Sequence, residues 1–115
     1  MELYFNNSLI VPFFPQNDDG EAAKPLLCLA DKLASEYSVS VRFCFPEDVR
    51  EREWVSDFNR YGVCFIPRQC SEAQKRLKKI FADLHPNIVH TFYGGYDVPA
   101  AKASRGGGYR YNLAQ

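Results

Sequence analysis

Two short stretches of the sequence carry the side chains best suited to chemistry. The stretch "NIVHTFYGG" places His90 near the end of an apolar run and closes with Gly94 and Gly95. The stretch "NDDGEAAK" gathers carboxylates and a glycine at positions 18–21. A histidine exchanges a proton near neutral pH, and glycines let backbone N–H groups approach an anion such as phosphate. Together the two stretches predict a binding site for a ligand.

The histidine and the paired glycines also have purely structural interpretations. His90 could hydrogen-bond a neighbouring backbone carbonyl, and Gly94 with Gly95 could form only a turn. The sequence leaves these alternatives open beside the binding role.

The carboxylates work against a phosphate ligand. Asp18, Asp19 and Glu21 would repel it unless a metal ion or Lys24 intervenes. The chain contains neither the spaced glycines of a dinucleotide fingerprint nor a phosphate-binding G-x-x-x-x-G-K-[ST] loop. Classical NAD binding and P-loop chemistry are therefore not expected.

The elements that must position these residues alternate between strand and helix. Apolar, β-favouring runs predict strands over residues 3–14, 39–45, 63–67 and 87–93. Apolar residues at helical spacing predict helices over residues 22–37, 48–61, 71–84 and 97–104, with Ser71 as a cap. Residues 105–115 are left as either a marginal fifth strand or a frayed tail.

This alternation predicts an α/β fold: a three-layer, doubly wound parallel sheet of four to five strands in the order 3-2-1-4-5. In that order the chain winds in opposite directions from strands one and four, and their carboxyl ends border a crevice. The loops that follow these two strands should meet there. The residues that we expect to bind substrate are Asp19, Gly20, Glu21, His90, Tyr93, Gly94, Gly95 and Tyr96.

Composition bounds the class of protein. The 115 residues fit one domain, and equal numbers of basic and acidic residues, 14 each, give no field that would attract nucleic acid. The four cysteines form no C-x-x-C pair, and three lie in apolar stretches expected inside the fold. We therefore expect reduced packing residues in a reducing compartment and no metal site. No targeting signal or transmembrane segment is expected.

Beyond these patterns, the sequence resembles a known family. A glycine-and-glutamate loop leads into "LLCLADKLASEYSVSVRF", and "LKKIFADLHPNIVHTFYGGYDVPAAKAS" follows later. This combination looks like the amino-terminal Rossmann-like domain of retaining GT-B glycosyltransferases of family 4. The junction "L-x-P-x-I-V-H-T" at positions 84–91 is its most specific part, and the similarity extends weakly over residues 1–104.

The resemblance implies transfer of a sugar from a nucleotide-sugar donor to a sugar or glycolipid acceptor, in the cytoplasm or at the inner face of a membrane. Such enzymes commonly assemble cell-surface polysaccharides or glycolipids. Gly20 would match the family's glycine beside the donor diphosphate, although Asp19 replaces a glycine. His90 would match the first histidine of a "V-H-x-H" pattern in which Phe92 replaces the second. Residues 94–97 would fall in an acceptor-lining loop.

The family's active-site histidine and its carboxyl-terminal, donor-binding domain have no counterpart in this chain. The resemblance therefore leads us to expect a truncated, acceptor-side domain that is inactive alone, with no assigned catalytic residue and no cofactor of its own. The alternative is a free-standing flavodoxin-like module that binds a small anion or a protein partner. An unpaired sheet edge or the tail would favour dimerisation.

Overall fold

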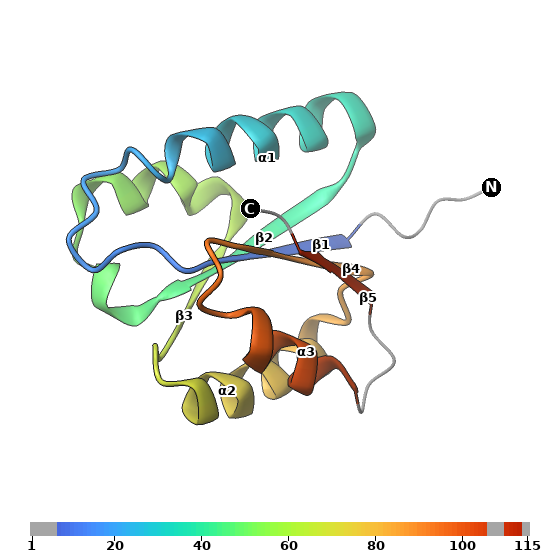
Figure 1. Cartoon of the computed structure of the whole chain (residues 1–115). Helices are drawn as coiled ribbons and strands as arrows, with labels where there is room; N and C mark the ends of the chain where they lie inside the picture. Colours follow the sequence, from blue (N-terminus) through green and yellow to red (C-terminus); the bar gives the residue numbers. More distant parts are fainter. Residues whose placement is uncertain (1–6, 106–109, 114–115) are drawn as a thin grey trace.

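The chain folds around a five-stranded sheet in which every pair of neighbouring strands is parallel (Figure 1). The structure is a computed structural model that describes residues 7–105 and 110–113. Its strands are β1 (Asn7–Pro12), β2 (Ser40–Pro46), β3 (Val63–Ile66), β4 (Ile88–Phe92) and β5 (Arg110–Leu113). Their order is β3-β2-β1-β4-β5. The predicted doubly wound α/β fold and its strand order are confirmed.

Helices cover both faces of this sheet and make three layers (Figure 1). On one face lie α1 (Lys24–Tyr37) and the short helices η1 (Glu47–Val49) and η2 (Glu53–Tyr61). The other face is covered by α2 (Cys70–Leu84) and α3 (Asp97–Arg105). Because β1 lies in the centre, its side chains alternate between the two cores: Leu9 and Val11 pack under α2 and α3, and Ile10 packs under α1.

The helix starts match the prediction at α1 but not at α2. Pro25 lies in the first turn of α1, where its missing N–H leaves no partner unsatisfied. In α2, Gln69 occupies the N-cap position with extended backbone, and no side chain caps the helix. Ser71 already lies inside the first turn. The predicted cap at Ser71 is therefore wrong.

The segment that we predicted as a second α-helix forms the 3₁₀ helices η1 and η2 instead. Val55, Phe58 and Tyr61 recur at intervals of three residues, and all three pack into the core on the α1 face. A 3₁₀ helix has three residues per turn, so that spacing aligns its side chains on one side. Here the apolar spacing matches a 3₁₀ helix better than an α-helix.

The ends of the chain fall partly outside the described residues. The first predicted strand begins at residue 3, but residues 3–6 lie outside the described part of the chain. Within the described part, β1 begins at Asn7. For residues 105–115 the sequence allowed either a fifth strand or a frayed tail. The structure has a strand there, β5, which pairs in parallel with β4. Residues 106–109, 114 and 115 lie outside the description.

The cysteines are free, but fewer are buried than the sequence predicts. Cys44 is fully buried and Cys64 is half-buried, whereas Cys28 and Cys70 are exposed. The expectation of three interior cysteines is therefore wrong, because Cys28 lies on the outer side of α1.

Candidate functional site

The carboxyl-end edge of the sheet carries the residues that the sequence singled out. The long connection from β1 to α1, residues 13–23, is organised by Asp18. The carboxylate of this buried residue accepts hydrogen bonds from the N–H groups of Gly20 (2.8 Å) and Ala22 (3.4 Å). Its backbone carbonyl accepts the indole N–H of Trp54 at 3.1 Å. Asp18 thus fixes the shape of this loop and ties it to η2.

The loop after β4 meets this first loop, as the strand order predicts. The hydroxyl of Tyr93 donates a hydrogen bond of 2.7 Å to the backbone carbonyl of Ala22. The Tyr93 ring lies 6.0 Å from that of Phe14, measured between centroids. Partial burial, and then the charge of Asp18, raise the pKa of the Tyr93 phenol. Two segments some seventy positions apart therefore form neighbouring rims of one edge.

Gly20 has its backbone N–H occupied within its own loop. The residue is buried, its φ is +104°, and a Cβ there would lie 3.2 Å from ring atoms of Trp54. Its N–H already donates to Asp18. A side chain there would be strained by the backbone conformation and would press on the indole, so packing accounts for this glycine. Its exposed neighbours Asp19 and Glu21 make local contacts: the Asp19 carboxylate accepts the N–H of Glu21, and the Glu21 carboxylate pairs with Lys24.

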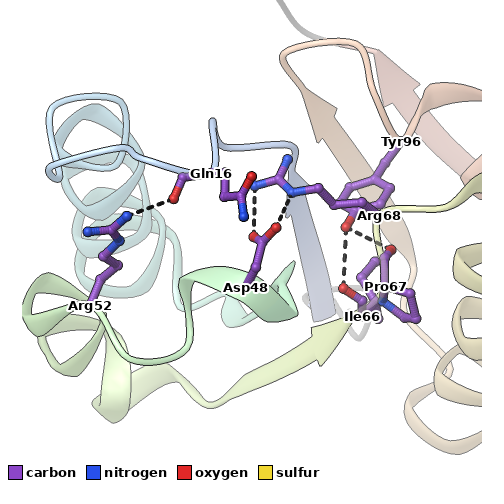
Figure 2. A network of polar contacts seen from close by, with 7 residues as sticks. All are labelled: Gln16, Asp48, Arg52, Ile66, Pro67, Arg68 and Tyr96. Carbon is purple, nitrogen blue, oxygen red and sulfur yellow. Dashed lines mark hydrogen bonds and ion pairs between the residues drawn. The ribbon is translucent and has the colours of Figure 1, made fainter.

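Tyr96 belongs to the core rather than to an open cleft. Its side chain is fully buried, and its hydroxyl donates to the carbonyl oxygen of Pro67 at 3.0 Å (Figure 2). Its ring meets that of Phe13 edge to face, with centroids 4.7 Å apart. Burial raises the pKa of the Tyr96 phenol well above its ordinary value. A Cβ on the exposed Gly95 would overlap the Phe13 ring, so this glycine too is explained by packing.

An ion pair fills the part of the edge next to Phe13 and Tyr96. The guanidinium of Arg68, which follows β3, makes two hydrogen bonds of 2.6 and 2.9 Å to the carboxylate of Asp48 (Figure 2). Its Cζ lies 4.8 Å from the centroid of the Phe13 ring. A planar guanidinium suits both contacts at once. Phe13, Arg68 and Tyr96 therefore fill the space beyond the ends of β1, β3 and β4.

The other half of the edge is open. A hollow of about 470 Å³ lies between the 13–23 loop and η2. Its lining residues are Asp18, Asp19, Arg52, Glu53, Trp54 and Asp57. A smaller apolar pocket of about 80 Å³ adjoins it, because Asp19, Trp54 and Asp57 line both and Leu27 and Phe58 continue the wall. The two together form a polar opening with an apolar recess.

The charges of this hollow are mainly negative. Asp18, Asp19, Glu53 and Asp57 contribute four carboxylates, and Arg52 contributes the single cation, which donates to the carbonyl of Gln16 at 3.0 Å (Figure 2). Such a lining repels phosphate groups and accepts hydrogen bonds from hydroxyl or ammonium groups. The half-buried indole of Trp54 adds an apolar surface.

His90 lies away from the rim, in the middle of β4. It pairs with Ile10 of β1 and is half-buried. Burial lowers the pKa of its imidazole below the ordinary value. Since Val89 packs under α2 and α3, the alternation of a strand directs His90 to the opposite, α1 face. Gly94 lies in the exposed turn, with φ of +81° and nothing near its missing Cβ.

Sequence reasoning missed the η2 side of this site. It predicted a helix over residues 48–61 but gave Arg52, Glu53, Trp54 and Asp57 no part in a binding site. The signal that was present is an aromatic residue flanked by carboxylates at i−1 and i+3, on a segment that follows a strand of the predicted sheet. Nothing in the sequence shows that η2 meets the 13–23 loop.

Comparisons with protein-family models, with characterised proteins and with solved structures found no match for this chain.

In the described part of the chain, no three histidine, cysteine or acidic side chains are arranged to hold a metal ion. Among the described helices, none combines the length and apolar character required to span a bilayer.

Proposed function

We propose that this chain is the acceptor-side, Rossmann-like half of a GT-B sugar transferase of the family 4 type, and that it binds a sugar or glycolipid acceptor. The donor nucleotide sugar would be held by a second, separate domain facing the carboxyl-end edge of the sheet. Such a protein would act in the cytoplasm. With a lipid-linked sugar as the acceptor, it would act at the inner face of the membrane.

The observation that carries this proposal is the chemistry of the hollow beside Trp54. Its carboxylates accept hydrogen bonds from sugar hydroxyl groups, and its indole offers an apolar surface to the C–H groups of a sugar ring. A neutral, polyhydroxylated ligand suits both features. The hollow also lies beyond the carboxyl end of β1, at the edge of the sheet where open α/β folds bind their ligands.

The rival function, binding of a small anion, fits the hollow less well. Four carboxylates against one guanidinium would repel a diphosphate. The N–H of Gly20, the group that the family resemblance assigns to the donor diphosphate, is occupied by Asp18. We therefore place the anionic donor outside this hollow.

A fluorescence titration tests the proposal, because Trp54 is the only tryptophan in the chain and lines the hollow. Neutral disaccharides of several linkages should change its emission in a saturable way, whereas pyrophosphate and a nucleoside diphosphate should not. The Asp57→Asn variant should weaken sugar binding by about tenfold, the value of one charge-assisted hydrogen bond.

The matched control is Asp83→Asn, which makes the same change on an exposed position of α2, on the opposite face of the sheet. It should bind like the parent chain. A response to pyrophosphate or to the nucleotide, with none to any sugar, would contradict the proposal and favour the anion-binding module.

A further inference from the structure

Two cysteines lie side by side on neighbouring strands, away from the hollow. Cys44 of β2 and Cys64 of β3 are direct partners in the parallel register. Both side chains belong to the core under α2 and α3, so they point to the same face of the sheet. Neighbouring strands run about 4.8 Å apart, and disulfides usually join Cα atoms about 4.4–6.8 Å apart. The backbone therefore already has the spacing that a disulfide needs.

The two thiols differ in accessibility. Cys44 is fully buried, whereas Cys64 is half-buried and lies on β3, a strand at one edge of the sheet. A small oxidant can reach the Cys64 thiol from that edge. The buried Cys44 thiol is shielded from the oxidant and can react only with the oxidised sulfur of Cys64 beside it. The arrangement provides one partly accessible, attacking thiol and one buried, resolving thiol.

The ionisation of the pair follows the same division. A hydrogen bond from Cys44, assisted by the charge of Arg42, lowers the pKa of Cys64 to about 6. The hydrogen bond with Cys64, and then burial, raise the pKa of Cys44 well above its ordinary value. Cys64 is thus the thiolate of the pair, and the thiolate is the reactive form of cysteine.

We propose that Cys64 and Cys44 form a redox pair that hydrogen peroxide converts reversibly into a disulfide. The Cys64 thiolate attacks one peroxide oxygen, the O–O bond breaks, and the departing hydroxide takes a proton to become water. The resulting Cys64 sulfenic acid is attacked by the sulfur of Cys44. The S–S bond forms, the S–O bond breaks, and the leaving hydroxide accepts the Cys44 proton. Two thiols are oxidised by two electrons, and one peroxide is reduced to two waters.

The disulfide would close a loop that contains η1 and η2. The hollow takes Arg52, Glu53, Trp54 and Asp57 from this loop, so oxidation would restrain one wall of it. The inference itself rests only on the cysteine pair and holds whatever ligand the hollow binds.

The experiment uses the full chain with Cys28→Ser and Cys70→Ser, which removes the two exposed thiols. Treatment with hydrogen peroxide, followed by alkylation and peptide mass mapping, should yield a linked Cys44–Cys64 peptide pair. The intact chain should lose two hydrogens and both alkylation sites while remaining a monomer, and dithiothreitol should restore them.

A variant separates the two roles. Adding Cys44→Ala, which keeps the buried position apolar, should stop the reaction at a Cys64 sulfenic acid that dimedone traps. Because the first measurement needs no change at Cys44, the proposal is testable even if this variant fails to fold. Persistence of both thiols under peroxide that oxidises Cys28 and Cys70 in the parent chain would overturn it. So would oxidation of Cys64 to a sulfinic acid while Cys44 remains reduced.

Discussion

The carboxyl-end edge of the sheet has a packed half and an open half. In the packed half, the rings of Phe13 and Tyr96 meet edge to face, and the Arg68–Asp48 pair lies against them. In the open half, the indole of Trp54 and several carboxylates line a hollow. Both halves combine aromatic rings with charged groups, yet they differ in packing: around Phe13 the side chains fill the edge, whereas beside Trp54 a hollow of about 470 Å³ opens.

The lengths of the connecting loops account for this difference. Residues 67–69 alone join β3 to α2, which holds Arg68 and Pro67 directly over the strand ends, within reach of Asp48 and Tyr96. Residues 13–23 join β1 to α1 and form a longer loop, which is held together by hydrogen bonds to Asp18. Short connections therefore seal the edge, and the long one leaves the hollow between itself and η2.

The largest expected effect contrasts two tyrosines of one loop. Tyr96→Ala should lower the free energy of unfolding by about 3–5 kcal/mol, because it empties a fully buried aromatic position. Tyr93→Ala, at a residue that is 41% exposed, should cost about 1 kcal/mol, the value of its one hydrogen bond. Urea unfolding followed by circular dichroism measures both. Similar losses would remove the distinction between packed core and open rim.

The adjacent glycines sharpen the same contrast. Gly95→Ala should destabilise the chain by about 1–3 kcal/mol, because its Cβ would overlap the ring of Phe13. Gly94→Ala meets no neighbouring atom and should cost about 1 kcal/mol, through the positive φ alone. Thermal unfolding of the two variants checks the order. A more harmful change at Gly94 would show that the turn, not the packing, constrains this loop.

The ion pair of the packed half should depend on the planar guanidinium. Arg68→Lys should cost about 1 kcal/mol, because lysine makes neither the paired hydrogen bonds to Asp48 nor the stacked contact with Phe13. Arg60→Lys is the matched control: Arg60 pairs with Asp31 in an exposed site, where the expected cost is about 0–0.5 kcal/mol. Equal costs in denaturant unfolding would mean that the packed half does not hold its ion pair more tightly.

The smallest effect concerns His90 and acid stability. Burial lowers the pKa of His90 in the folded chain below its ordinary value of 6.5, so the unfolded chain binds more protons in the range just below pH 6.5. Stability from this group is therefore complete above pH 6.5 and is lost as the pH falls below it. His90→Leu should flatten that part of the stability curve.

Denaturant unfolding of the parent chain and of His90→Leu, at several pH values on either side of 6.5, measures this slope. An unchanged slope in the variant would contradict the assignment to His90.

The fold could be predicted because the order of element types limits the possible sheets. Strand–helix alternation and the winding rule place the loops after β1 and β4 together, and the Tyr93–Ala22 hydrogen bond shows that contact. The segment 53–61 was harder, since residues at intervals of three in a short stretch resemble one face of an α-helix.

The open part of the site could not be predicted for a different physical reason. A glycine that admits a ligand and a glycine that admits a neighbouring ring have the same sequence signature. Gly20 lies under Trp54 and Gly95 lies against Phe13, contacts between segments far apart in the chain. Likewise, nothing local distinguishes the buried Tyr96 from the exposed Tyr93. Which half remains open depends on tertiary packing.

The proposed binding of a neutral sugar in the hollow beside Trp54 can be followed residue by residue. The fluorescence titration first identifies a disaccharide that binds. An NMR titration of the isotopically labelled chain with that disaccharide then follows the amide and indole N–H resonances. We predict that saturable shifts concentrate at Asp19, Trp54 and Asp57 and leave the α2–α3 face unchanged. Shifts confined to any other face, or none at all with every sugar tried, would contradict the account.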